Sequence, residues 1–255
     1  MSAGLPEMPI FETRTIKKNL FWTGGWDSTF RLLQLLLENH CPVQTYYLID
    51  HNQPSSTREI KSMQKSGRGF FYRFPKTQTL LLPTRFTEIS AIKPNSRITN
   101  AYLEILKSKH LGEQYEWLAR FCAEHHIFDR ELSIVDDGAF HHFITDLSGN
   151  NGGNGACEGE PNKKDLLEIF RFYTFPLMNL SKLQMKKIAE DRAWMGILKL
   201  TWFCHNPILG KIPCGKCRPC EIALEEGMGW RIPAAVRWTT NITRKHANKK
   251  AGTIS

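Results

Sequence analysis

Two apolar segments near the start of the chain flank a pair of glycines, and this arrangement limits the fold more than any other feature. Residues 17–23 predict a strand, residues 28–38 contain five leucines and predict a mostly buried helix, and residues 43–50 predict a second strand. Strand, helix and strand in this order form the unit from which parallel sheets with covering helices are built. The sequence therefore predicts an α/β fold with a parallel sheet.

After residue 50 the sequence predicts further helices and strands, from weaker apolar patterns. Helices are predicted over residues 56–65, 115–125 and 221–226, and strands over 79–82 and 131–135, the latter ending at Asp136 and Asp137. Ser181 and Gln184 form a capping box for a helix that continues to about residue 193. Residues 148–164 are rich in Gly and Asn without apolar periodicity, which predicts a flexible loop.

The turn between the first strand and the first helix has the composition of an anion-binding loop. Its sequence is Thr23-Gly24-Gly25-Trp26-Asp27-Ser28-Thr29. Two glycines allow a sharp bend and a close approach of the backbone to a ligand, and a helix N-terminus attracts phosphate through its free amides and dipole. The hydroxyls of Ser28 and Thr29 are further donors to phosphate oxygens.

This turn lacks the lysine of a Walker A loop and the third glycine of a dinucleotide fingerprint. It resembles the Ser-Gly-Gly-x-Asp-Ser loop of the PP-loop ATP pyrophosphatases, with Thr23 in place of the first serine. The resemblance implies a Rossmann-like, adenine nucleotide alpha-hydrolase-like domain that splits ATP between its α- and β-phosphates. It makes Asp27 and Ser28 the candidate catalytic residues. It also suggests nucleotide contacts for Asp50, at the end of the second strand, and for Arg58 and Lys182.

Four of the seven cysteines lie close together, at Cys204, Cys214, Cys217 and Cys220. Four thiolates in so short a segment are typical of a tetrahedral metal site in a reducing compartment. The spacing does not continue as an iron–sulfur run does, so we expect a structural Zn²⁺ ion. His205, beside the first cysteine, is an alternative ligand, although a place in a turn is the simpler interpretation.

The order of the two motifs is similar to that in the 7-cyano-7-deazaguanine synthases. The matching segments are the N-terminal loop, Pro176-Leu177, Leu180-Ser181-Lys182, Thr201-Trp202-Phe203-Cys204, Pro207 and Cys214 through Cys220. The resemblance implies that ATP and Mg²⁺ activate 7-carboxy-7-deazaguanine as an adenylate, and that ammonia displaces AMP to give the amide. A second ATP then activates the amide oxygen, and loss of AMP leaves the nitrile. It also implies a homodimer.

Departures from that family leave other hypotheses open. His51-Asn52-Gln53-Pro54 stands where the family has a Tyr-Gly-Gln run, which puts the substrate and the acceptor in doubt. A paralogue could transfer the activated acid to an amine on a protein or a nucleic acid. A tRNA thiolase would need a cysteine near the nucleotide, and Cys41 is expected at the opposite end of the sheet. A zinc-ribbon binding module without catalysis is the third alternative.

Composition sets the remaining limits. The chain has 255 residues, of which 41% are hydrophobic and 23% charged, as expected for a globular protein. No signal peptide is visible and no segment reaches the roughly 20 apolar residues of a membrane span, so we expect a cytoplasmic protein. The expected organisation is an ATP-binding domain over 1–200, a zinc-binding segment over 201–230 and a basic tail over 231–255, which carries much of the net charge of +9.

Overall fold

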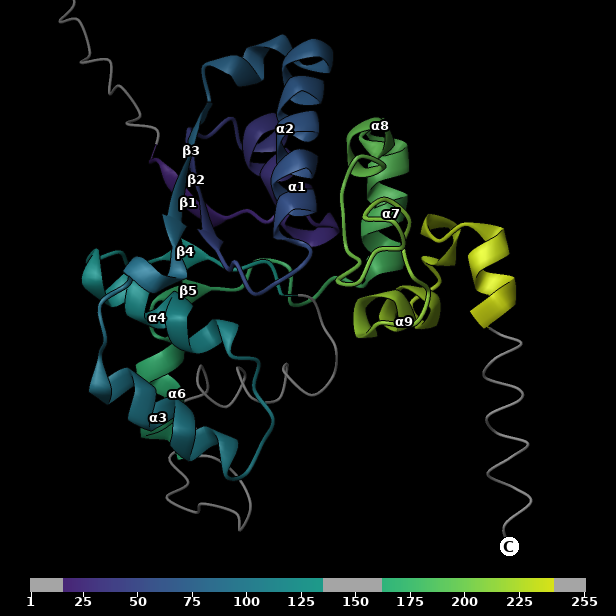
Figure 1. The fold of residues 1–255 in the computed structure, drawn as a ribbon. Helices are drawn as coiled ribbons and strands as arrows, with labels where there is room; N and C mark the ends of the chain where they lie inside the picture. The colour runs from purple at the N-terminus through teal and green to yellow at the C-terminus, as the bar shows by residue number, and fades with distance from the viewer. Residues whose placement is uncertain (1–15, 135–161, 241–255) are drawn as a thin grey trace, which may run out of the picture.

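The computed structural model describes residues 16–134 and 162–240, and its centre is a parallel sheet of five strands (Figure 1). The strand order is β3-β2-β1-β4-β5, and every neighbouring pair is parallel. The chain thus moves outward from β1 to β3 and then crosses to the other side of β1. The strands are β1 (Lys18–Phe21), β2 (Val43–Ile49), β3 (Leu81–Glu88), β4 (Arg130–Glu131) and β5 (Tyr173–Thr174). The predicted α/β class with a parallel sheet is confirmed.

Helices cover both faces of the sheet, because successive strand residues point to opposite sides. Leu20 packs into one apolar layer and Phe21 into the other. The first layer holds α1 (Trp26–Leu33) with its π-helical continuation Gln34–Glu38, α2 (Ser56–Arg73), α7 (Lys182–Asp191) and α8 (Met195–Leu198). The second holds α3 (Ser96–Leu106), α4 (Gln114–Glu124) and α6 (Lys163–Phe170).

Several elements are longer than their local sequence predicts. The helix predicted over 56–65 continues to Arg73, through two glycines that favoured an earlier end. A methyl group built on Gly69 would lie 2.8 Å from Ile197 Cδ1, so the small residue allows α2 to pack closely on α8. The strand predicted over 79–82 spans Leu81–Glu88, and α3 and β5 were not predicted. Tertiary packing decides these lengths.

The predicted loop over 148–164 lies mostly outside the described residues. Its last residues are ordered as the start of α6, where the Asn162 side chain accepts a hydrogen bond from the Lys164 amide at 2.9 Å. Asp136 and Asp137 also lie outside the described residues.

The carboxyl-terminal part forms a small unit beside α7. It contains the four cysteines, α9 (Arg218–Glu225) and the 3-10 turn Gly229–Arg231, followed by helical residues 234–240. Ile232 is buried against Cys204, Cys214 and Cys220. Residues 232–240, assigned to the basic tail from sequence, therefore pack as part of this unit, whereas 241–255 lie outside the described residues. In the described part of the chain, no helix has the length and apolar character needed to cross a membrane.

Candidate functional site

The glycine-rich bend between β1 and α1 is held from two sides. Gly24 has φ +68°, and a methyl group on it would lie 2.9 Å from both the Glu59 carbonyl oxygen and Met63 Cγ. Its own carbonyl oxygen accepts hydrogen bonds from Ser62 Oγ at 2.9 Å and from the Trp202 amide at 3.0 Å. Only glycine meets both the dihedral and the space requirement, so the position is needed to shape the bend.

The hydroxyl groups of the bend point in different directions. Thr23 Oγ1 lies 3.3 Å from Ser28 Oγ, and Ser28 Oγ also accepts from the Thr23 amide at 3.3 Å. Thr29, in contrast, is fully buried and accepts a hydrogen bond from the Trp22 indole at 3.0 Å. Of the predicted ligand residues, Thr23, Gly25, Asp27 and Ser28 thus line open space, whereas Gly24 and Thr29 support the bend from behind.

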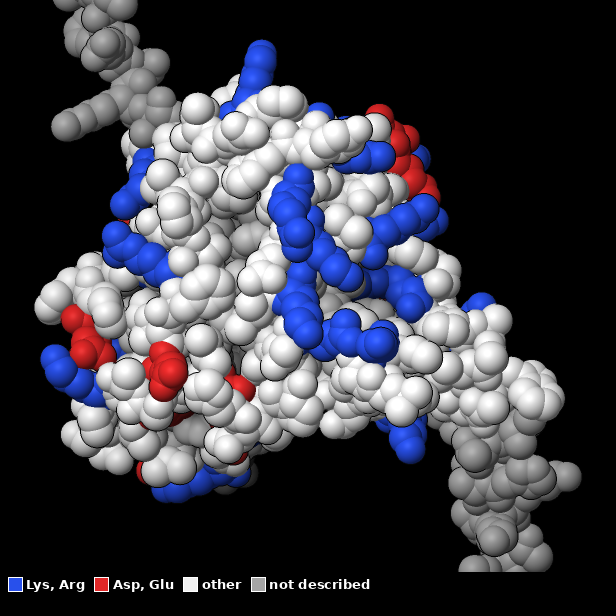
Figure 2. All heavy atoms as spheres, turned by 45° about the horizontal axis from the view of Figure 1, so that its top comes forward, with Lys and Arg blue, Asp and Glu red and all other residues white. Residues whose placement is uncertain are grey.

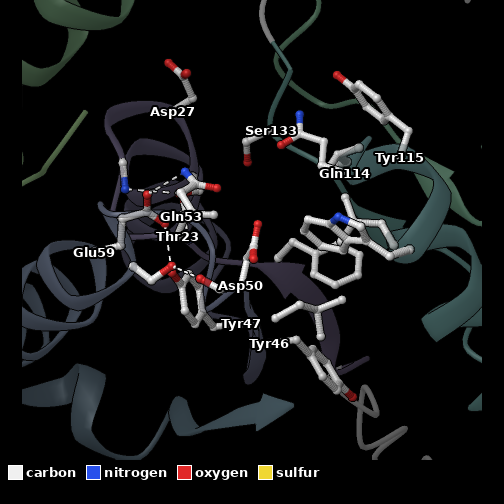
Figure 3. Close-up of a pocket in the computed structure, with 18 of the residues that line it drawn as sticks. Thr23, Asp27, Tyr46, Tyr47, Asp50, Gln53, Glu59, Gln114, Tyr115 and Ser133 are labelled. Carbon is white, nitrogen blue, oxygen red and sulfur yellow. Dashed lines mark hydrogen bonds between the residues drawn. The ribbon is translucent and has the colours of Figure 1, made fainter. Parts of the chain in front are cut away.

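A cavity of ≈ 270 Å³ opens from the bend at the carboxyl ends of β1, β2 and β4 (Figure 3). The sheet order reverses between β1 and β4, and ligands of open parallel sheets bind at such a switch point. Asp50 follows β2 and its carboxylate points into the cavity, while one of its oxygens accepts from the Asn52 amide at 2.8 Å; its contact with nucleotide stays a prediction. Gln114, Tyr115 and Trp117 of α4 form the opposite wall.

A hydrogen-bonded group on the floor of the cavity was not predicted. Glu59 of α2 accepts from the Tyr47 hydroxyl at 2.9 Å and from the Ser55 hydroxyl at 2.6 Å, and Gln53 Nε2 donates to Ser55 Oγ at 2.9 Å. Burial, together with the Glu59 charge, raises the pKa of Tyr47 well above its ordinary value, so the phenol remains a neutral donor. No local pattern marks Tyr47 and Glu59, since they meet only because α2 packs on β2.

A second hollow of ≈ 290 Å³ lies on the other side of the bend and holds two cations. Lys182, predicted as a phosphate contact, is the first residue of α7 and forms an ion pair with both carboxylate oxygens of Asp27. Arg231 was assigned to the basic tail, yet its guanidinium donates to the Thr201 carbonyl at 3.0 Å and hydroxyl at 2.8 Å. It also lies 4.3 Å from the Phe203 ring centroid and 5.3 Å from that of Trp26.

Arg231 keeps its charge at neutral pH. Burial lowers the pKa of Arg231 to about 10, while the Asp27 charge opposes that shift. Three carboxylates, those of Asp27, Glu59 and Glu226, line this hollow together with the two cations, so an anion on the bend would depend on Lys182 and Arg231 for favourable charge. Arg58 lies elsewhere: its guanidinium is 5.8 Å from the Trp202 ring centroid and lines neither hollow, so its contact with nucleotide stays a prediction.

The four cysteine sulfur atoms form a cluster that could hold a metal ion such as zinc. All four lie within 4.8 Å of one another, with 4.0 Å between Cys214 and Cys220 and 3.8 Å between Cys204 and Cys217. A tetrahedron with Zn–S bonds of about 2.3 Å has edges of about 3.8 Å. Hydrogen bonds from the thiol of Cys220, the amide of Cys214 and the remaining thiols lower the pKa of Cys204, which favours the thiolate that a metal requires.

The backbone around the cluster supports the same interpretation. The Cys217 amide donates to Cys214 Sγ at 3.3 Å, and the Cys214 amide donates to Cys204 Sγ at 3.2 Å. Gly215 has φ +74°, and a methyl group there would lie 2.8 Å from Thr240 Oγ1. His205 does not belong to the cluster, because it lines the two hollows beside the bend instead.

The adjacent histidines His125 and His126 lie at the end of α4 and have a structural role. His125 ends α4, where its Nδ1 lies 3.0 Å from the Phe121 carbonyl oxygen, and neither it nor His126 joins a metal cluster of the described chain. Cys41 lies before β2, at the end of the sheet opposite the cavity, and no cysteine of residues 16–134 or 162–240 lines either hollow. This arrangement offers no described thiol for a thiolase reaction.

Comparison with known proteins does not assign this site to a protein family. No protein-family model and no curated protein matches the sequence. What the chain does must therefore be inferred from the bend, the two hollows beside it and the cysteine cluster.

Proposed function

We propose that the chain is an ATP-dependent carbon–nitrogen ligase that activates a carboxylate as an acyl-adenylate and releases pyrophosphate. One observation carries the proposal. The bend presents the Gly25 backbone and the hydroxyls of Thr23 and Ser28 to open space at the switch point of a parallel sheet, with Lys182 and Arg231 beside it. Backbone amides, hydroxyls and fixed cations are the groups that bind a polyphosphate.

The two hollows suggest a division of the substrates. The outer phosphates of ATP would lie on the bend between Lys182 and Arg231, and the adenosine and the acid would share the larger cavity with Asp50 and the aromatic wall of α4. The most suitable acid, from the resemblance to 7-cyano-7-deazaguanine synthases, is 7-carboxy-7-deazaguanine, with ammonia as the acceptor. A planar base fits beside the rings of Tyr115 and Trp117.

The chemistry in this proposal needs positioning and charge stabilisation. The carboxylate oxygen forms a bond to the α-phosphorus while the bond to the bridging oxygen breaks, and the electron pair leaves with pyrophosphate. Lys182 and Arg231 would stabilise that leaving group. Asp27 offers a carboxylate of the kind that Mg²⁺ prefers, and the ion when bound would neutralise phosphate charge. None of the four cysteines lines either hollow, so the cluster would be structural. Reduced thiolates and ATP both suit the cytoplasm.

The test is a product analysis. The purified protein is incubated with ATP, Mg²⁺ and 7-carboxy-7-deazaguanine, with and without ammonia, and nucleotides and bases are identified by mass. We expect AMP and pyrophosphate, together with the amide or nitrile when ammonia is present. AMP formed without consumption of ammonia would indicate another amine acceptor. ADP as the product would contradict the proposal. The absence of any nucleotide product, with salt-sensitive polyanion binding, would favour a binding module.

A further inference from the structure

A groove of ≈ 410 Å³ lies between α2 and the carboxyl-terminal unit, separate from the cavity at the switch point. Its walls come from segments that are distant in sequence: α2, residues 199–203, residues 211–213 and the turn at 230–231. Six cations line it, and they are Arg58, Lys61, Lys65, Lys199, Lys211 and Arg231. Folding therefore gathers positive charge from four segments into one depression.

None of the described residues that line the groove is acidic. The lysines at 61, 65, 199 and 211 are exposed, and none of them forms an ion pair within residues 16–134 and 162–240. Figure 2 shows blue side chains as a band across the middle of this face, with red ones toward its margins. Like charges that converge without counter-charges repel one another, and a bound polyanion would relieve that repulsion.

Aromatic surface accompanies the charge. Trp230 is 40% exposed at the groove, and the half-buried Trp202 ring faces the Arg58 guanidinium at 5.8 Å. Proteins that hold single-stranded nucleic acid combine a cationic groove for the backbone with aromatic rings on which bases stack. An acidic peptide would use the cations but has no need of the exposed ring.

The groove also leads toward the bend. Trp202, Phe203 and Arg231 line both the groove and the hollow that contains Lys182 and Asp27. A strand lying in the groove would therefore pass close to the place where ATP is expected to react. This last point rests on the proposed function, whereas the binding itself does not.

We propose that this groove binds a single strand of nucleic acid, through its phosphates on the lysines and through a base stacked on Trp230. A nucleic-acid strand would then be the macromolecular partner of the site, and an amine on that strand is the acceptor to test.

The experiment is a fluorescence anisotropy titration of a labelled 20-nucleotide RNA of mixed sequence, without ATP, over a series of salt concentrations. The full chain should bind with an affinity that falls steeply as salt rises. The triple variant K61E/K65E/K211E should bind at least about tenfold more weakly, and the magnitude of its log–log salt slope should fall by about two, as expected for three lost phosphate contacts on a single strand. Trp230→Ala should weaken binding about tenfold with the slope unchanged.

The matched control reverses three exposed lysines far from the groove, K17E/K163E/K164E, so that both triple variants have the same net charge. If the two triple variants bind alike, the groove is not the site. Binding of polyglutamate in preference to RNA would also overturn the proposal. AMP formation from the free acid is measured in parallel: K61E/K65E/K211E should retain it, because none of these lysines lines the nucleotide hollows. Failure of nucleic-acid binding is thereby distinguished from failure of the ATP reaction.

Discussion

The glycine-rich bend and the cysteine cluster are both short motifs, yet they are built in opposite ways. The bend turns Thr23, Asp27 and Ser28 toward open hollows, and its carboxylate pairs with Lys182. The cluster turns inward: Cys204 and Cys220 are fully buried and pack on Ile232. A motif that presents groups to solvent contributes to binding, whereas a motif that replaces an apolar core contributes to folding. Variants in the bend should therefore change activity first, and variants in the cluster should change stability first.

The largest effect should come from the cluster. Cys220→Ser removes one of the four thiols that could hold a metal ion. If the small core of this unit is built on that ion, we expect the free energy of unfolding of the unit to fall by about 5 kcal/mol or more. Metal content by mass spectrometry and denaturant unfolding measure the change. Cys41→Ser is the matched control, because its half-buried thiol lies outside the cluster, and it should keep both metal and stability. Equal metal content in the two variants would refute the assignment of the site.

The next effect should appear at the bend and in activity alone. Asp27→Ala removes the carboxylate that orients Lys182 and offers a ligand to Mg²⁺, and we expect AMP formation to fall at least about 100-fold. The free energy of unfolding should change by about 1 kcal/mol or less, because the ion pair is partly exposed. Steady-state kinetics and thermal unfolding are measured on the same sample. If Asp27→Ala lost much of its free energy of unfolding but kept its activity per folded molecule, the two motifs would not differ in the way described.

Two arginines sharpen the contrast further. Arg231 borders the bend, so Arg231→Met should raise the KM for ATP by about tenfold, the loss expected for one charged hydrogen bond. Arg130 is fully buried on β4, 3.6 Å from the Tyr46 ring centroid, and its guanidinium has no hydrogen-bond partner in the described chain. Because an unpaired buried charge is costly, Arg130→Met should leave KM nearly unchanged and leave stability equal or higher. Equal changes in KM for both variants would remove Arg231 from the site.

The smallest effect concerns pH and a cysteine outside the cluster. Burial raises the pKa of Cys122 from 9.0 to about 11, opposite in sign to the shift at Cys204. A thiol whose pKa is raised on folding stabilises the protein fully below pH 9, and this contribution is lost as the pH rises toward 11. The loss should amount to about 2 kcal/mol. Denaturant unfolding at pH 8 to 11 should therefore show a shallower decline for Cys122→Ala than for the unchanged protein. Parallel declines would mean that Cys122 does not titrate in this range.

Sequence alone determined those features that one continuous element sets. The β-branched and aromatic residues at 43–50 predicted the second strand, the Gly-Gly pair predicted the bend, and the capping box predicted the start of the helix at Lys182. The cysteine spacing predicted the cluster in the same way, because three ligands lie within seven residues of one another. In each case covalent geometry and local hydrogen bonds limit where the next residues lie.

Only the tertiary structure decided which distant segments meet. It turned the Thr29 hydroxyl into the core, brought Glu59 under Tyr47 and moved Arg231 from an expected tail to the edge of the bend. It also gathered the lysines of α2 with Lys199 and Lys211 in one groove. Sequence spacing fixes distances only inside a continuous helix, strand or turn. Between elements, the distance depends on how the apolar faces pack, and that is a property of the whole fold.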